Sequence, residues 1–136
     1  MVRILAVYQR RLQCEVVHEP SQTRLLTDAP KDNMGNGASF SPTDLTATSL
    51  LTCMLTTMGI VAQKGGFEFG RASGEVIKEM SPAPDRKIAR LTVLIRMPQG
   101  LSSEQKALME RTALTCPVFK SLSPGIEIPV RFEYPA

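Results

Sequence analysis

Two cysteines of this chain stand in sequence surroundings that can support thiol chemistry. Cys53 lies in the uncharged stretch "SPTDLTATSLLTCM", where Thr and Ser side chains recur on the same helical face as the thiol. Cys116 lies in "LTCPVFKSL", directly before a proline that can begin a short helix with Cys116 as its cap. Hydroxyl groups and the free N–H groups of a helix start can both stabilise a thiolate. Buried, inert thiols occur in similar settings, so the residues alone leave packing and redox roles open.

The third cysteine and the only histidine belong to a predicted strand. In "RLQCEVVH" the residues alternate, and Cys14 and His18 share the face predicted to point inward. We interpret both as core residues, because a metal site would need further ligands. Three cysteines, with no CxxC pair, fit neither a disulfide framework nor a zinc site, and we expect no metal and no cofactor.

The elements that must position these thiols form an α+β pattern. Three strands, "VRILAVY", "RLQCEVVH" and "TRLLTD", predict a meander, followed by the loop "APKDNMGNGASF". Ser41 can cap a helix, with Pro42 at its first position and Asp44 completing a capping box. The helix should run to about Lys64, where Gly65-Gly66 ends it.

The second half of the sequence predicts two strands, a helix and a closing strand. The strands are "RASGEVIKEM" and "RKIARLTVLIRM", and the helix "LSSEQKALMERTAL" begins at Ser102 or Ser103. In "GIEIPVRFEY", Pro129 marks an edge strand. The order of elements is typical of the α+β class.

Composition excludes several classes of function. The chain has 136 residues, 43% of them hydrophobic, the length of one domain, and its net charge of +3 is spread over a mixed surface. Without tryptophan or interleaved aromatic and basic residues, we expect no nucleic-acid binding. The start, "MVRILAVYQRR", does not resemble a secretory signal, so we expect a cytoplasmic protein.

Residues 45–62 carry no charge and reach the length of a membrane span. Their six Thr and Ser residues and the lack of aromatic or basic flanks argue against a span, and we expect no membrane partner. A helix that is apolar nearly all round must be covered on every side. In a chain this short, that cover indicates a partner subunit.

Three motifs resemble a known family. Pro42, Leu45 and Cys53 in "SPTDLTATSLLTC", the following "AQKGG", and Cys116 in "CPVFKSL" are similar to the OsmC/Ohr family of osmotically inducible and organic hydroperoxide resistance proteins. The resemblance implies a single OsmC-like domain over residues 1–136. It also implies antiparallel sheets wrapped around long central helices in an intertwined homodimer, with two thiol sites at the interface.

In the peroxidases of that family, the cysteine of the long helix attacks an organic hydroperoxide, and the later cysteine resolves the sulfenic acid as a disulfide. Cys53 and Cys116 hold those positions, so the resemblance implies a peroxidase in oxidative stress defence that a thiol reductant regenerates. It places the supporting arginine on Arg11, with Arg10 as the alternative. The glutamate that orients this arginine is replaced by Thr43, and the adjacent Asp44 faces away from Cys53.

Two hypotheses therefore remain. The first is a cofactor-free thiol peroxidase, in which Cys53 is the nucleophile, Cys116 the resolving thiol and Arg11 an electrostatic support. The second is a dimeric binding or stress-associated protein that holds a small hydrophobic ligand and has little or no peroxidase activity. The two cysteines favour the first hypothesis, and Thr43 favours the second.

Overall fold

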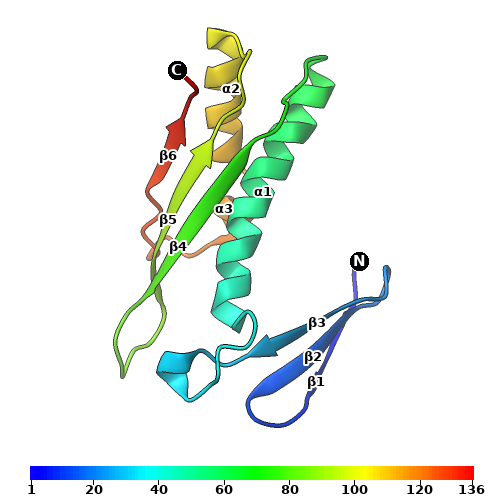
Figure 1. The fold of residues 1–136 in the computed structure, drawn as a ribbon, viewed down its shortest axis with the longest axis vertical. Helices are drawn as coiled ribbons and strands as arrows, with labels where there is room; N and C mark the ends of the chain where they lie inside the picture. Colours follow the sequence, from blue (N-terminus) through cyan, green and yellow to red (C-terminus); the bar gives the residue numbers. More distant parts are fainter. The chain divides into compact units, whose positions relative to one another are not determined.

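The computed structural model describes residues 1–136 and contains two compact units, residues 1–46 and residues 47–136. Each unit has its own three-stranded sheet. The long helix α1 (Pro42–Lys64) begins in the first unit and continues through the second (Figure 1). The structure therefore confirms the mixed α+β class that the sequence predicts.

The first unit is the predicted meander. Strands β1 (Ile4–Tyr8), β2 (Gln13–His18) and β3 (Thr23–Asp28) pair antiparallel in that order. The sequence predicts that the second strand begins at Arg11, but β2 begins at Gln13, and Arg11 and Leu12 belong to the β1–β2 turn. Arg11 and Leu12 have φ angles of 58° and 65°, and the Gln13 N–H donates to the Arg10 carbonyl at 3.3 Å. Two left-handed residues in a tight hairpin match the strand twist, although bulky side chains rarely adopt them.

The sheet of the first unit has no apolar core of its own. The three residues of this unit that are buried, Thr27, Asp28 and Ser41, are all polar. Cys14 and His18, expected in a core, are half-buried, because no second layer within residues 1–46 covers their face. Large apolar side chains are exposed along the strands and turn: Ile4, Leu5, Val7, Tyr8, Leu12, Leu25 and Leu26.

The loop from Ala29 to Phe40, which includes the short 3-10 helix η1 (Lys31–Asn33), folds around Asp28. One carboxylate oxygen of Asp28, Oδ2, accepts the Ala38 N–H at 2.9 Å, while Oδ1 is buried without a partner. At Gly35 an added Cβ would lie 1.7 Å from the Ala29 carbonyl oxygen, so only glycine fits there. The loop is thus closed tightly on a fully buried carboxylate.

Helix α1 begins with the predicted capping box. The Asp44 N–H donates to Ser41 Oγ at 3.1 Å, and the Ser41 N–H donates to Asp44 Oδ2 at 2.9 Å. The helix ends at Lys64, and Gly66 adopts a φ of 74° after it. Asp44 is therefore engaged at the helix start, as the sequence indicates.

The second unit contains strands β4 (Ser73–Met80), β5 (Ile88–Arg96) and β6 (Val130–Glu133), with helices α2 (Ser103–Ala113) and α3 (Pro117–Ser121) between β5 and β6. Strands β4 and β5 are antiparallel, but β5 and β6 are parallel. The expectation of antiparallel sheets is wrong here, because the connection through α2 and α3 is a crossover that returns the chain in the same direction. Strand β6 is an edge strand preceded by Pro129, as predicted.

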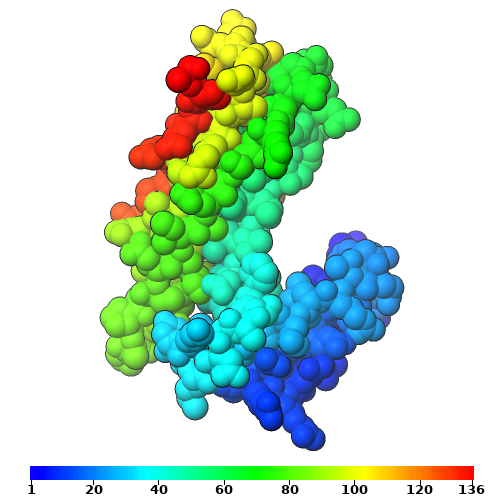
Figure 2. Space-filling model, viewed as in Figure 1, coloured from blue at the N-terminus to red at the C-terminus, as the bar shows by residue number.

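The hydrophobic core lies in this second unit. One stripe of α1, recurring at three- and four-residue spacing, packs with the predicted inner face of β5 and with α2. Figure 2 shows atoms of β4, β5, β6 and α2, green through red, in continuous contact. The core residues of the three elements, together with Met97 directly after β5, are Ala47, Leu50, Met54, Met58, Ala62, Leu91, Val93, Ile95, Met97, Met109 and Ala113.

One face of α1 remains exposed. Ile60 is 46% exposed, although the sequence predicts a helix surrounded on all sides. By length and composition α1 is also the one helix that could cross a membrane, a test that the core helices of soluble proteins pass as well. One stripe of α1 is buried in the core of the second unit.

Candidate functional site

Cys53 lies near the middle of α1, one residue before the buried Met54. Its side chain is half-buried, so the thiol is neither enclosed in the core nor fully solvated. Thr57 follows one helical turn later, and its Oγ1 lies 3.7 Å from Cys53 Sγ. The hydroxyl-rich face that the sequence predicts around Cys53 thus provides one direct contact to sulfur.

Cys116 caps helix α3, as the proline after it predicts. Its Sγ accepts the Phe119 N–H at 3.4 Å, and Pro117 occupies the first helical position. The residue is fully buried. A thiol in this position is held by backbone groups that have no partner within the helix.

The fold brings these two cysteines together, although they are far apart in the sequence. The thiols of Cys53 and Cys116 hydrogen-bond to each other, and both are free. The Val118 N–H, from the first turn of α3, also donates to Cys53. Sequence analysis did not identify Val118 as a contact of Cys53. The predicted start of α3 at Pro117 was the available signal, because the second helical position has a free N–H.

The two thiols differ in acidity. Burial raises the pKa of Cys53, but hydrogen bonds from the Val118 N–H, the Thr57 hydroxyl and the Cys116 thiol outweigh it, so the pKa is lowered. Burial also raises the pKa of Cys116, and the neighbouring Cys53 raises it further against the N–H groups of Phe119 and Val118. Cys53 therefore ionises first. Cys116 stays protonated, and its S–H is the donor in the hydrogen bond to the Cys53 sulfur.

The predicted supporting residues lie in the first unit. Arg11 and Arg10 are exposed in the β1–β2 turn, so a contribution of either to the thiol site stays a prediction. Thr43, at the position predicted for an orienting glutamate, has its Oγ1 3.3 Å from Ser41 Oγ. The neighbouring carboxylate of Asp44 is bound in the helix cap.

Cys14 and His18 are also in the first unit and do not belong to the thiol pair. Cys14 pairs with Tyr8 on one side and Thr27 on the other. His18 Nδ1 lies 2.6 Å from Ser21 Oγ in the β2–β3 turn. These contacts are those of strand and turn residues.

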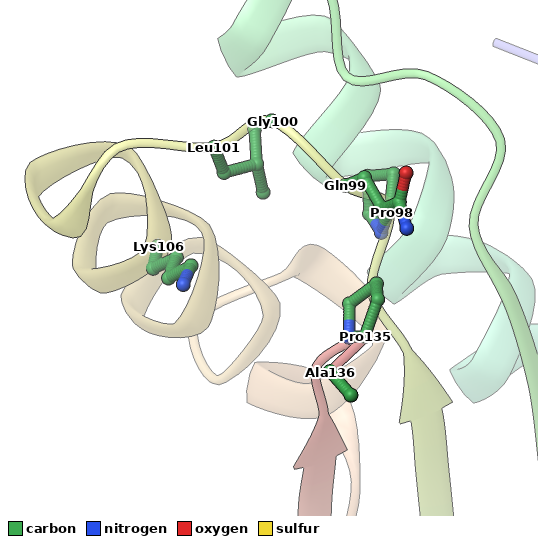
Figure 3. A pocket seen from close by; sticks show the side chains of 7 residues that line it. All are labelled: Pro98, Gln99, Gly100, Leu101, Lys106, Pro135 and Ala136. Carbon is green, nitrogen blue, oxygen red and sulfur yellow. The ribbon is translucent and has the colours of Figure 1, made fainter.

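Two pockets of the second unit lie near its helices. A pocket of about 410 Å³ beside α3 is lined mainly by apolar residues, among them Leu114, Phe119 and Ile126. A smaller one, about 250 Å³, lies between the start of α2 and the end of β6, and Figure 3 shows Lys106 and Ala136 on its wall. Of these two pockets, only the larger one shares a residue with the surroundings of the thiol pair. This residue is Phe119, which lines the pocket and donates its N–H to Cys116.

Comparison with known proteins assigns the chain to one family. The family model described as OsmC-like protein matches residues 35–131. Among curated protein sequences, none matches this chain. A crystal structure from Psychrobacter arcticus 273-4, described as a candidate osmotic stress induced and detoxification response protein, is 39% identical, with a TM-score of 0.90. The match covers 98% of this chain and 96% of that protein.

More distant structures share the fold. An OsmC-like protein from Mycoplasma pneumoniae has a TM-score of 0.83 at 17% identity, over 100% of this chain and 98% of the other. The organic hydroperoxide resistance protein OhrB of Bacillus subtilis has a TM-score of 0.70 at 14% identity, over 98% of each chain. At these identities the similarity shows the fold alone.

Proposed function

Because the chain belongs to the OsmC-like protein family, we propose that it is a thiol-dependent peroxidase that reduces organic hydroperoxides in oxidative stress defence. Solved structures of the same fold include proteins named for organic hydroperoxide resistance. The observation that carries the proposal is the Cys53–Cys116 pair, whose pKa values are shifted in opposite directions. A two-cysteine peroxidase needs one ionised thiol as the nucleophile and a second thiol close enough to form a disulfide with it.

The reaction runs in three steps. The Cys53 thiolate attacks one oxygen of the hydroperoxide, the O–O bond breaks, and the alkoxide takes a proton to leave as an alcohol. Cys53 becomes a sulfenic acid, two electrons more oxidised. The Cys116 sulfur then attacks the Cys53 sulfur and displaces water, which forms a disulfide. An external thiol reductant supplies two electrons and two protons to restore both thiols.

Arg11 is the proposed electrostatic support for the thiolate and for the leaving oxygen, with Arg10 as the alternative. Arg11 lies in the tight β1–β2 turn, where its side chain is exposed and its charge is not used by an ion pair within residues 1–46.

We further propose a homodimer in the cytoplasm. The exposed apolar side chains of β1, such as Leu5 and Val7, and the uncovered face of α1 at Ile60 support a second copy as their cover. Light scattering at micromolar concentration should give twice the chain mass. A monomeric mass at that concentration would contradict the dimer and leave these side chains unexplained.

A second candidate function is a dimeric binding or stress-associated protein that holds a small hydrophobic ligand. Thr43 supports it, because no carboxylate stands at the position predicted to orient the arginine. The apolar pocket beside α3 offers a surface for such a ligand. In that case the thiols react slowly or not at all.

A thiol count before and after one equivalent of cumene hydroperoxide separates these functions. The peroxidase should lose two thiols within minutes, and peptide mass spectrometry should identify a Cys53–Cys116 disulfide within one chain. Cys53→Ser should abolish hydroperoxide consumption, because a hydroxyl does not ionise near neutral pH. Cys14→Ser is the matched control and should react like the parent. Unchanged thiols in the parent protein would support the binding protein instead.

A further inference from the structure

Threonine hydroxyls on the helices of this protein usually bond to the backbone of their own helix. Thr52 donates to the Thr48 carbonyl at 2.8 Å, and Thr112 donates to the Leu108 carbonyl at 2.7 Å. Thr46 likewise donates to the Pro42 carbonyl at 3.5 Å. In each case the acceptor is the carbonyl four residues earlier, the usual partner of a helical threonine.

Thr57 uses its hydroxyl differently. Its Oγ1 lies 3.7 Å from Cys53 Sγ, within the range of a hydrogen bond to the larger sulfur atom. Both residues are on one face of α1, one turn apart, so the helix itself fixes their separation. Thr57 is half-buried, whereas Thr52 is exposed, so water competes less for the Thr57 hydroxyl.

We propose that Thr57 is a positioning residue for Cys53, whose hydroxyl donates to the thiolate and favours the ionised form of that side chain. When the Cys53 proton leaves for solvent, the Thr57 O–H turns toward sulfur and keeps its own proton. The bond then becomes charge-assisted and stronger than any bond to the neutral thiol. After sulfur has attacked an oxidant its charge is gone, and the bond weakens.

The other groups that face Cys53 come from the start of α3. They are the Val118 N–H and the Cys116 thiol, and neither is a charged side chain. Burial raises the pKa of Cys53, and the Thr57 hydroxyl is among the groups that reverse this effect. Within residues 47–136, Thr57 is therefore the one side-chain hydroxyl acting on this sulfur.

The proposal rests on the proposed function only in treating ionised Cys53 as the nucleophile, so its test uses no peroxide. The full-length protein is alkylated with iodoacetamide across a pH series, and peptide mass spectrometry follows Cys53. Thr57→Val keeps the shape and removes the hydroxyl, so the midpoint of the rate profile should move up by about half to one pH unit. Near neutral pH the alkylation rate should fall about three- to tenfold.

Three further variants make the test specific. Thr57→Ser keeps the hydroxyl and should titrate like the parent. Thr57→Ala also removes the hydroxyl, so it should show the same shift as Thr57→Val and replaces Thr57→Val in the test if Thr57→Val folds poorly. Thr52→Val removes an exposed hydroxyl from the same helix and should leave the profile unchanged. A parent-like profile for Thr57→Val or Thr57→Ala, or a shifted one for Thr57→Ser, overturns the proposal.

The peroxidase assay then separates the two proposals. If the hydroxyl-free variants show the shift while the parent consumes no hydroperoxide, Thr57 acts on Cys53 and the proposed function is wrong. If the parent consumes hydroperoxide and the hydroxyl-free variants show no shift, the function stands and the role of Thr57 is wrong.

Discussion

Residues 1–46 and residues 47–136 each contain a three-stranded sheet, but only the second unit buries apolar side chains. The second unit buries an apolar cluster that includes Leu50, Met54 and Ile95 at 0% exposure. The first unit buries only polar residues and leaves apolar strand residues such as Ile4 in solvent. A three-stranded sheet with no second layer cannot form a core by itself.

The difference separates the candidate catalytic residues into two kinds. Cys53 and Cys116 are held by contacts formed wholly within the second unit, including the Val118 N–H and Thr57. Arg11 belongs to the unit that lacks a core of its own. The acidity of Cys53 is therefore set within one packed unit, while the electrostatic support proposed for Arg11 would come from the other unit.

The largest expected effect is loss of turnover on replacing the fully buried thiol. Cys116→Ser should still react with one equivalent of hydroperoxide, because Cys53 keeps its thiolate. Its sulfenic acid should persist and be trapped by a dimedone-type reagent, and excess peroxide should convert it to sulfinic acid. Mass spectrometry measures each product.

The outcome that breaks this assignment is equally clear. A Cys116→Ser variant that cycles as fast as the parent would mean that a thiol outside the second unit, such as Cys14, resolves the intermediate. The self-contained character of the thiol site would then be wrong.

A stability comparison tests the difference in burial directly. Leu50→Ala should lower the free energy of unfolding by about 3 kcal/mol, because it leaves a cavity in the core. Leu26→Ala, at a side chain 37% exposed in the first unit, should cost about 1 kcal/mol or less. Urea unfolding monitored by circular dichroism gives both values.

The same pair sharpens the comparison when protein concentration is varied. Both costs are measured at high protein concentration and again after dilution, with Ile60→Ala as a control on the exposed face of α1. If Leu26→Ala costs as much as Leu50→Ala only at high concentration, a second copy covers the first sheet. If Leu26→Ala and Leu50→Ala cost the same free energy of unfolding at every protein concentration, the proposed difference in burial between the two units is wrong.

A smaller effect concerns the start of α1. If the arginine of the β1–β2 turn is loosely placed, Thr43→Glu should raise the rate of Cys53 oxidation about tenfold, equivalent to about 1.4 kcal/mol. Stopped-flow measurement with a slow organic hydroperoxide provides the rate. Thr43→Gln is the matched control, since it has a similar size without the charge. A rate no higher than the parent's in folded Thr43→Glu would mean that no arginine is held from this position.

Local signals in the sequence predicted much of the framework of the site. The capping box of Ser41 and Asp44 and the helix start at Cys116-Pro117 were both predicted, because caps depend on residues within one turn of each other. The inner face of β5 was also predicted, since alternation is a property of the strand itself.

Features that depend on distant parts of the chain were predicted less well. The parallel pairing of β6 with β5 follows from the crossover, which residue alternation does not encode. Alternation in β2 indicated a buried face for Cys14, yet burial requires a second layer that this unit lacks. The contact of Val118 with Cys53 needs the packing of α3 on α1, so only the free N–H of a helix start could be anticipated.

The crossover also has a consequence for biosynthesis. Cys53 leaves the ribosome about sixty residues before Cys116 and the first turn of α3, which takes on the order of several seconds at ordinary rates of translation. Until then its sulfur has no Val118 N–H beside it and no second thiol to form a disulfide with. The groups of the C-terminal segment that lower the pKa of Cys53 therefore act on it only when that segment docks.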